Sequence, residues 1–288
     1  RNGRVRMSLY MPLAGVVSDT YMERDLQNNR NKDDVDRGIS YDFDITAIEA
    51  FNNRKYDVIF TGSIRDYEDI DTQIYNLDDS LQDMWDIVLG YICEDTSLTI
   101  ERMSDYSLRL MDEHVHQIIL LFKKMDSVIR AMHRQRVITA IADGGIKIDV
   151  FGDGWDFLKN KLIHPENLCI HECVSYEESV NIAAQAKISV NVMPWFKTGF
   201  HDRIATAMLN GCVSVTDSSS YIDDNYTDGE NIVIYKLDNL SELAGNIRTL
   251  LENKNNITYR LAMAGKKKAV QADTWHERAK WFLSYCSQ

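Results

Sequence analysis

Residues 187–216 read KISVNVMPWFKTGFHDRIATAMLNGCVSVT, and this stretch decides the fold. Apolar residues dominate 187–193 and 212–216, as expected for two short buried strands. Between them, 201–210 has the apolar spacing of a helix and ends just before Gly211. A strand, a helix and a second strand in this order predict a βαβ unit with parallel strands and a right-handed crossover.

The same alternation extends over most of the chain. Further strands are predicted at 56–61, 146–151, 167–171 and 231–235. Further helices are predicted at 175–186, 240–252, 256–272 and 274–285. We therefore expect an α/β fold, a doubly wound parallel sheet of the Rossmann-like kind, with helices on both faces. Such sheets bind ligands at the carboxyl ends of their strands.

Two segments do not fit this alternation. The interval after the first strand is too long for one crossover, and its apolar spacing predicts helices at 83–91, 105–124 and 126–143. We interpret about 66–143 as a helical insertion. Residues 1–55 are predicted to hold a lead-in strand at 4–11, which Pro12 ends, and a polar linker. The predicted lobe therefore spans 56–288.

Composition excludes several classes of protein. The 288 residues carry 44 acidic and 32 basic side chains, a net charge of −12 that disfavours binding to nucleic acid. The one basic run, 266–268, lies in a helical pattern and is interpreted as a solvated face. Five cysteines in a chain of this size do not indicate a disulfide framework. With no apolar run of about 20 residues and no signal-peptide pattern, we expect a cytoplasmic protein.

Glycine-rich turns follow two of the predicted strands. Gly62 and Ser63 come after the first, and Gly152, Asp153 and Gly154 come after the second. Glycine allows a ligand to approach the backbone, and free amides at a helix start can bind phosphate. The alternative is that both are ordinary tight turns. The third glycine of the dinucleotide fingerprint is absent, so a nicotinamide-dependent oxidoreductase is disfavoured.

Three spacings resemble metal sites, and none leads us to predict one. The Cys169-x-His171-x-Cys173 triad lies in what we expect to be a central strand and has no evident fourth ligand, so core thiols are the preferred interpretation. His114 and His116 diverge on a helix. A further pair, Asp42-x-Asp44, does not follow a strand.

The segment that opens the helix at 201–210 is the most informative about chemistry. His201 and Arg203 fall in its first turn, where the helix dipole favours acids rather than cations. Both residues make sense there if they face an anion such as a diphosphate, which Arg203 could bind through two nitrogens. The alternative is a solvent-facing helix start in which Arg203 pairs with Asp202.

The segment that contains these residues resembles a known protein family. Residues 199–253, GFHDRIATAMLNGCVSVTDSSSYIDDNYTDGENIVIYKLDNLSELAGNIRTLLEN, resemble the C-terminal lobe of GT-B glycosyltransferases of the CgeB-like, glycosyltransferase family 4-like group. The motif residues are Gly199, His201, Arg203, Ala207, Gly211, Thr216-Asp217 and Asp228-Gly229-Glu230. The tail AGKKKAVQADTWHERAKWFL and the two glycine turns also match, so the resemblance spans about 5–285 and is strongest over 145–285.

The resemblance implies transfer of a sugar from a nucleotide-diphosphate donor to a glycan or protein acceptor, with retained anomeric configuration and no obligatory metal. Bacterial cell-surface glycans are the associated products. It places His201 and Arg203 at the departing diphosphate as catalytic residues. The donor-binding positions that it implies are Gly62, Ser63, Gly152, Asp153, Gly154, Cys173, Val174, Gly199, Phe200 and Thr206.

Two departures from the family pattern keep a second function open. Many relatives carry a pair of glutamates where Thr198 and Thr206 stand here, so a carboxylate that could hold the ribose is missing. Residues 1–55 are also too short and polar to form the N-terminal lobe that usually completes the cleft. The alternative is therefore a catalytically degenerate module that binds a nucleotide or a protein. In it, the helical insertion would serve as a docking or homo-oligomerisation surface.

Overall fold

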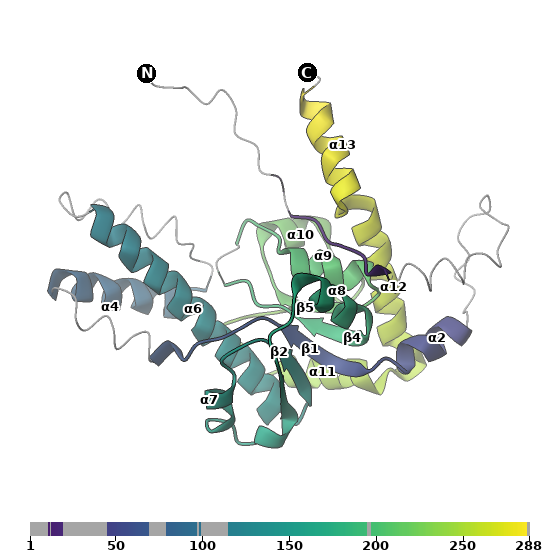
Figure 1. Cartoon of the computed structure of the whole chain (residues 1–288), viewed down its shortest axis with the longest axis horizontal. Helices are drawn as coiled ribbons and strands as arrows, with labels where there is room; N and C mark the ends of the chain where they lie inside the picture. The colour runs from purple at the N-terminus through teal and green to yellow at the C-terminus, as the bar shows by residue number, and fades with distance from the viewer. Residues whose placement is uncertain are drawn as a thin grey trace.

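Six parallel strands form a single sheet in the computed structural model, which describes residues 11, 13–19, 45–68, 79–96, 98, 115–194 and 197–286 (Figure 1). The strands are β1 (Tyr56–Thr61), β2 (Ile148–Phe151), β3 (Leu168–His171), β4 (Ala186–Val190), β5 (Val213–Asp217) and β6 (Val233–Tyr235). Their order is β3-β2-β1-β4-β5-β6, and all five neighbouring pairs are parallel. This confirms the predicted doubly wound, Rossmann-like α/β fold.

Helices cover both faces of the sheet. The helices are α2 (Ile45–Asn52), α4 (Asp79–Glu94), α6 (Val115–Asp143), α7 (Asp156–Lys159), α8 (Tyr176–Ala184), α9 (Asp202–Leu209), α10 (Ser220–Asn225), α11 (Leu243–Glu252), α12 (Ile257–Ala272) and α13 (Trp275–Cys286). The C-terminal half of α6 and α11 pack together on one face. On the other face, α8 and α9 contact each other, and α9 also contacts α12.

The alternation of apolar side chains along β1 explains why helices pack on both faces of the sheet. Val58 and Phe60 are fully buried in the cluster formed with α6 and α11. Ile59 points the opposite way and is fully buried in the cluster formed with α8. A strand buried on both faces is the expected state of a central parallel strand.

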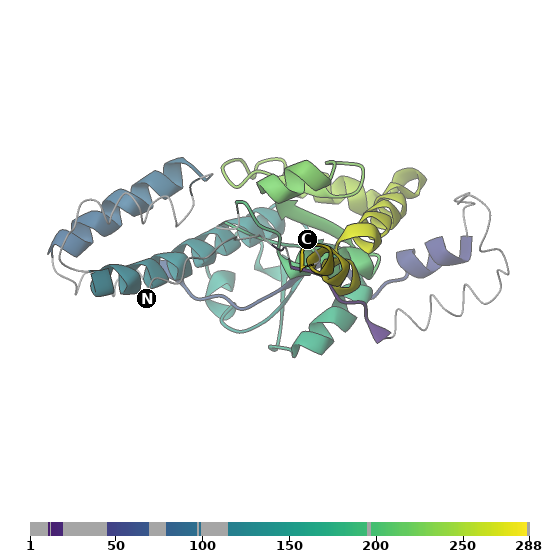
Figure 2. The same ribbon diagram turned by 90° about the horizontal axis from the view of Figure 1, so that it is seen from above.

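The long helix α6 connects β1 to β2 and also reaches beyond the sheet. Its C-terminal half packs in the main core through Val137, Ile138 and Ile141, each fully buried. Its N-terminal half instead packs on α4, through Met125, Val128 and Ile129. Figures 1 and 2 show α4 lying beside this part of α6, away from the sheet.

Two details of the prediction are wrong. The expected helices at 105–124 and 126–143 are one continuous helix from residue 115, because Asp126 pairs with Arg130 one turn later and does not interrupt it. The strand at 168–171 lies at the sheet edge rather than the centre, because the chain crosses from β3 to β4 on the far side of β1. The predicted lead-in strand at 4–11 lies outside the described residues, apart from Met11.

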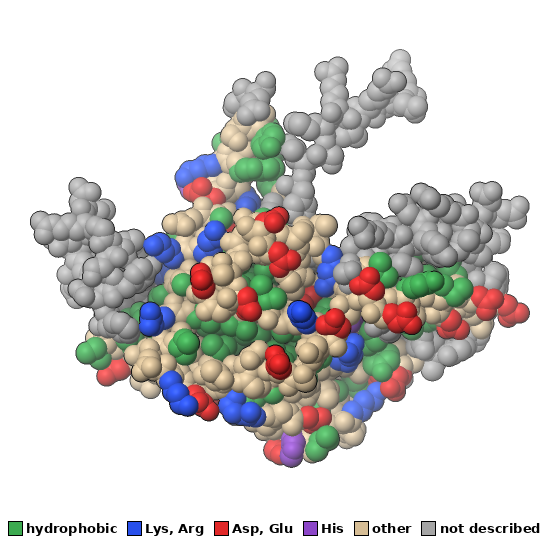
Figure 3. Space-filling model, turned by 180° about the vertical axis from the view of Figure 1, so that it is seen from behind, with side chains coloured by type: hydrophobic (Ala, Val, Ile, Leu, Met, Phe, Trp, Pro, Cys, Tyr) green, Lys and Arg blue, Asp and Glu red, His purple; other side chains and the backbone are tan. Residues whose placement is uncertain are grey.

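Residues 15–18, near the start of the described chain, contact the residues that follow α9 and α12. The Gly15 N–H donates to the Asp273 carbonyl, and the Ser18 N–H donates to Asn210 Oδ1 at 2.7 Å. The last helix, α13, projects from the body and carries apolar side chains on its surface (Figure 3). Phe282 and Leu283 are among its exposed apolar residues. Among the described helices, none combines the length and apolarity that a membrane crossing requires.

Candidate functional site

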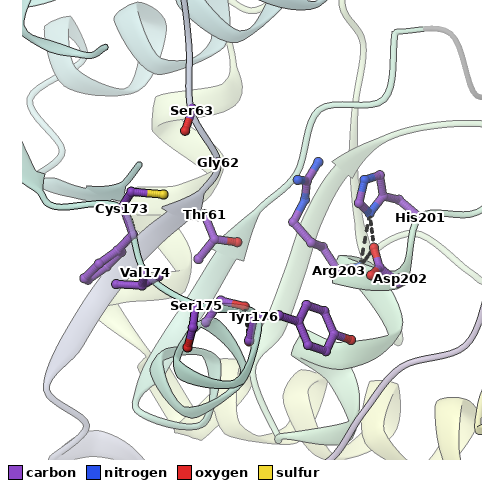
Figure 4. Close-up of a pocket in the computed structure, with 12 residues that line it drawn as sticks. Thr61, Gly62, Ser63, Cys173, Val174, Ser175, Tyr176, His201, Asp202 and Arg203 are labelled. Carbon is purple, nitrogen blue, oxygen red and sulfur yellow. Dashed lines mark hydrogen bonds and ion pairs between the residues drawn. The ribbon is translucent and has the colours of Figure 1, made fainter. Parts of the chain in front are cut away.

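A cavity of about 210 Å³ opens where the carboxyl ends of β1 and β4 meet (Figure 4). The chain proceeds from β1 through β2 to β3 in one direction along the sheet, and from β4 through β5 to β6 in the other. The connections that leave β1 and β4 therefore diverge, and a crevice forms between them. The cavity is lined by the turn after β1, the end of β2, the start of α8 and the start of α9: Thr61, Gly62, Ser63, Phe151, Cys173, Val174, Ser175, Tyr176, Ser179, His201, Asp202 and Arg203.

Arg203 extends from the first turn of α9 into this cavity, between Gly62 and His201 in Figure 4. Its Nε donates to Asn191 Oδ1 at 3.1 Å, and Asn191 Nδ2 donates to Thr216 Oγ1 at 3.0 Å, which fixes the direction of the guanidinium. Its Nη2 is buried and has no hydrogen-bond partner among the described residues. Burial, followed by the nearby charge of Arg134, lowers the pKa of Arg203 to about 10, so it stays charged at neutral pH.

A second arginine, Arg134 of α6, lies beside it. Its Nη1 donates to the Ser63 carbonyl at 2.6 Å, while its Nε is buried without a hydrogen-bond partner among the described residues. The guanidinium carbons of Arg134 and Arg203 lie 5.7 Å and 6.0 Å from the centre of the same Phe60 ring. Two half-buried cations, each with a buried nitrogen that has no hydrogen-bond partner among the described residues, form a site suited to an oxyanion at the end of the parallel sheet.

The sequence analysis missed Arg134, because α6 was interpreted as core. A usable signal was present, since basic side chains at 130, 133, 134 and 136 crowd one stretch of an acidic chain. A helix that leads into a parallel strand also runs antiparallel to it. Nine residues of helix span about 14 Å, close to the length of a four-residue strand, so Arg134 lies level with the carboxyl edge.

His201 and Asp202 form a pair at the start of α9. His201 Nδ1 lies 2.5 Å from Asp202 Oδ1, and the same oxygen accepts the Arg203 N–H at 2.9 Å. Burial lowers the pKa of His201, and the charge of Arg203 adds to this, although Asp202 opposes it. For Asp202, burial raises the pKa, but the hydrogen bond from His201 and the charge of Arg203 outweigh it and the net shift is downward. A neutral imidazole beside a carboxylate and a guanidinium is therefore the resting arrangement at neutral pH.

The glycine turns after β1 and β2 contact each other, and they have different roles. Gly62 and Ser63 line the cavity. A Cβ at Gly152 would lie 2.5 Å from the Gly62 carbonyl oxygen, and one at Gly154 would overlap the carbonyl oxygen of Ile64. Both turn glycines have positive φ, 152° and 85°. Gly152 and Gly154 thus allow the two turns to approach, and Asp153 donates its N–H to Ser63 Oγ at 3.0 Å.

Gly152, Asp153 and Gly154 are not among the residues that line the cavity, and three more predicted donor-binding residues are also absent from its lining. Phe200 is 1% exposed and stacks on Tyr226 with ring centres 5.8 Å apart. The Gly199 carbonyl accepts a hydrogen bond from Ser219 Oγ. Thr206 Oγ1 accepts the Val16 N–H at 3.2 Å, so its hydroxyl is engaged within the fold. These residues hold the start of α9 in place.

Cys173 and Val174, in contrast, line the cavity, in the connection from β3 to α8. That connection ends at Ser175, whose Oγ accepts the Glu178 N–H at 3.1 Å and caps α8. Thr198 is exposed in the loop before α9 and is not among the lining residues.

The described residues contain no group of three side chains able to hold a metal ion. His171 Nε2 instead lies 2.7 Å from Asp149 Oδ1 on the neighbouring strand. His114 and the Asp42 and Asp44 pair lie outside the described residues, and the side chain at 116 is not described.

The sequence matches the model of a family described as glycosyl transferase-like, over residues 130–284. This is more than half of the 288 residues. The chain belongs to this glycosyl transferase-like family. The match covers β2 to α13 and the part of α6 that carries Arg134. It also coincides with the residues where the predicted resemblance is strongest, and the resemblance to glycosyltransferases is thereby confirmed.

Several solved structures are similar to this chain. Anabaena Alr3699/HepE in complex with UDP is 15% identical, with a TM-score of 0.44, over 51% of this chain and 44% of that one. Sucrose-phosphate synthase from Thermosynechococcus elongatus is 15% identical, with a TM-score of 0.46, over 54% of this chain and 42% of that one. The pneumococcal O-GlcNAc transferase GtfA, in complex with UDP and GlcNAc, is 15% identical, with a TM-score of 0.42, over 53% and 32%. The chain thus spans less than half of each, and no curated protein matches it.

Proposed function

We propose that this chain is the donor-binding lobe of a glycosyltransferase and that its cavity holds the diphosphate of a nucleotide sugar. The observation that carries the proposal is the buried guanidinium of Arg203, whose Nη2 has no hydrogen-bond partner among the described residues and which lies at the switch point of the sheet. Membership of a glycosyl transferase-like family supports the same assignment. The base would lie toward Cys173 and Val174, which line the opposite side of the cavity.

The chemistry follows from where charge develops. When an acceptor hydroxyl attacks the anomeric carbon, a new C–O bond forms and the bond from that carbon to the β-phosphate oxygen breaks. The electron pair remains on the diphosphate, which also accepts the hydroxyl proton directly or through solvent. Arg203 and Arg134 are placed to stabilise this departing charge, and fixed cations of this kind favour the transition state over the ground state.

Within this proposal, His201 orients the site. Its Nδ1 contacts Asp202, whose Oδ1 also accepts the Arg203 N–H, so the pair fixes the first turn of α9. A neutral imidazole here can exchange hydrogen bonds with a sugar hydroxyl without repelling Arg203. A glycan or protein acceptor and retention of anomeric configuration belong to the same proposal, as does a second lobe that faces the cavity.

The alternative, binding without turnover, is favoured by one observation. Position 206 carries a threonine whose hydroxyl accepts the Val16 N–H, so it offers no carboxylate to a ribose. A site that lacks this contact could still bind a diphosphate through Arg203 and Arg134.

Separate measurement of binding and turnover tests both functions. Equilibrium affinity for nucleotide sugars and the rate of nucleoside diphosphate release are measured for the natural chain, Arg203→Gln and Arg134→Gln. Arg136→Gln, at an exposed position of α6, is the control. We expect Arg203→Gln to weaken binding by about 10- to 100-fold, because a hydrogen bond to a charged group is worth about 1.5–3 kcal/mol. The proposal is wrong if neither Arg203→Gln nor Arg134→Gln weakens binding. Binding without any release of product would favour the alternative.

A further inference from the structure

A second cavity, of about 370 Å³, lies on the other side of the β1 turn. It is bounded by the turn after β1, by Asp153 after β2, and by one stripe of α6: Ser127, Arg130, Ala131 and Arg134. Ser63 lines both cavities, so the two spaces are neighbours. Of the three arginines that line it, the diphosphate assignment uses only Arg134.

The lining of the second cavity is strongly basic. Arg65, Arg130 and Arg134 contribute three guanidinium groups, and Asp153 is the one acidic residue among the residues that line it. Arg130 pairs with Asp126, but the Nε of Arg134 has no hydrogen-bond partner among the described residues. Such a concentration of positive charge contrasts with the net charge of −12 for the whole chain.

Arg130 and Arg134 repel each other, and both repel Arg203 in the donor site. Burial lowers the pKa of Arg134, and the charge of Arg130 lowers it further. Arg130 also contributes to the lowered pKa of Arg203. Repulsion of this kind costs stability unless an anion relieves it, which is typical of sites built for a ligand rather than for the fold.

The geometry of α6 explains how the stripe is presented. Residues 127, 130, 131 and 134 lie three or four positions apart and therefore share one face of the helix. Val128 and Ile129, on another face, are 1% exposed and pack against α4. The contact with α4 thus fixes the rotation of this part of α6 and turns the arginine stripe toward the β1 turn.

We propose that the second cavity binds an oxyanion carried by the acceptor, a phosphate ester or a carboxylate, beside the donor diphosphate. The proposal rests on the proposed function, since it takes the first cavity as the donor site. Arg65 and Arg130 supply the charge that recognises the acceptor, and Arg134 lies between the two anions. Guanidinium groups suit both oxyanions because their paired N–H groups match two oxygens at once.

Titration of a small oxyanion into the protein saturated with a nucleoside diphosphate tests this proposal. Glycerol 3-phosphate and glucuronate are the two probes, used with the natural chain, Arg65→Gln, Arg130→Gln and the exposed control Arg136→Gln. We expect at least one probe to bind together with the nucleoside diphosphate. Arg65→Gln and Arg130→Gln should each weaken that probe about tenfold and change nucleoside diphosphate affinity less than twofold. Circular dichroism and melting curves establish that each variant folds, and whichever probe binds more tightly identifies the oxyanion.

Several results would overturn the proposal. These are competition between the probe and the nucleoside diphosphate, failure of both probes to bind at millimolar concentration, and an equal loss in Arg136→Gln. A further one is Arg130-dependent preference for UDP-glucuronate over UDP-glucose, which would assign the cavity to the donor sugar. If the probe binds through Arg130 while no nucleoside diphosphate binds at all, the proposed function fails and an oxyanion site remains.

Discussion

Gly154 shows how a residue can be singled out for one reason and needed for another. Its place after a strand suggested a backbone that approaches a phosphate. In the structure, its missing side chain instead makes room for the Ile64 carbonyl, so the β1 and β2 turns can meet. The sequence identifies such a turn, but the partner of the turn comes from a segment some 90 residues away and carries no local signal.

Gly154→Ala should therefore destabilise the protein by more than the strain of placing an alanine at a positive φ. Gly154 has a φ of 85° and a crowded Cβ position, whereas Gly229 has a φ of 74° and open space around it. Conformational strain costs about 1–2 kcal/mol at both sites, and the clash at Gly154 adds about 1–3 kcal/mol. Urea denaturation of Gly154→Ala and Gly229→Ala measures the difference, and equal losses would show that the turn contact contributes nothing.

Helix α6 is the element whose length could not be predicted. Its two halves pack against different partners: the outer half packs against α4, and the inner half packs against the sheet. The apolar residues of the two halves therefore lie on different faces of the helix. The apolar spacing changes between the halves, which explains the predicted break near Asp126. The strands were placed to within a few residues because each is a short apolar run between turns, and such runs need only local information.

Trp85→Ala tests whether the α4 contact holds the outer half of α6. Trp85 is 2% exposed in the cluster with Met125, Val128 and Ile129, whereas Ile87 on the same helix is 50% exposed. Loss of a buried tryptophan costs about 3–5 kcal/mol, and an exposed substitution about 0.5 kcal/mol or less. Hydrogen exchange should accelerate over 79–94 and 122–130 in Trp85→Ala, but neither in Ile87→Ala nor in the sheet. Acceleration throughout the sheet would contradict this division of α6.

The distinction between local and long-range information also explains why only part of the candidate site could be predicted from the sequence. Arg203 and His201 lie at the start of the helix that follows β4 in the sequence, so their place at the carboxyl edge follows from the fold class. Arg134 reaches that edge only because a helix runs back along β2, and its role depends on contacts with Ser63 and Phe60. Such long-range placement requires the three-dimensional structure.

For the molecule as a whole, burial of an imidazole should make stability depend on pH. Burial, together with the charges of Arg136 and Lys197, lowers the pKa of His133 to about 4 from 6.5. The unfolded chain therefore binds a proton between about pH 6.5 and pH 4 that the folded chain does not, and stability falls as pH falls through this window. The loss amounts to roughly 3 kcal/mol, since one pKa unit corresponds to about 1.4 kcal/mol.

His133→Gln should flatten this part of the pH profile. Urea denaturation at pH 7, 5.5 and 4.5 gives the free energy of unfolding, and the natural chain should lose more of it on acidification than the variant does. His276→Gln, at an exposed position of α13, should leave the profile of the natural chain unchanged. Parallel profiles for His133→Gln and the natural chain would mean that His133 is protonated in the fold.

The central claim is that Arg203 receives the diphosphate of a nucleotide at the carboxyl edge of the sheet. The most direct test is a thermal-shift comparison of UDP, GDP, ADP and CDP with the corresponding monophosphates, in the natural chain and in Arg203→Gln. A ligand at about 100 times its dissociation constant adds about 2.7 kcal/mol to the stability of the folded state, which is a clear rise in Tm. We predict that one nucleoside diphosphate raises Tm more than its monophosphate, and that Arg203→Gln abolishes the difference. The account is contradicted if none of the four stabilises the chain, or if the shift persists unchanged in Arg203→Gln.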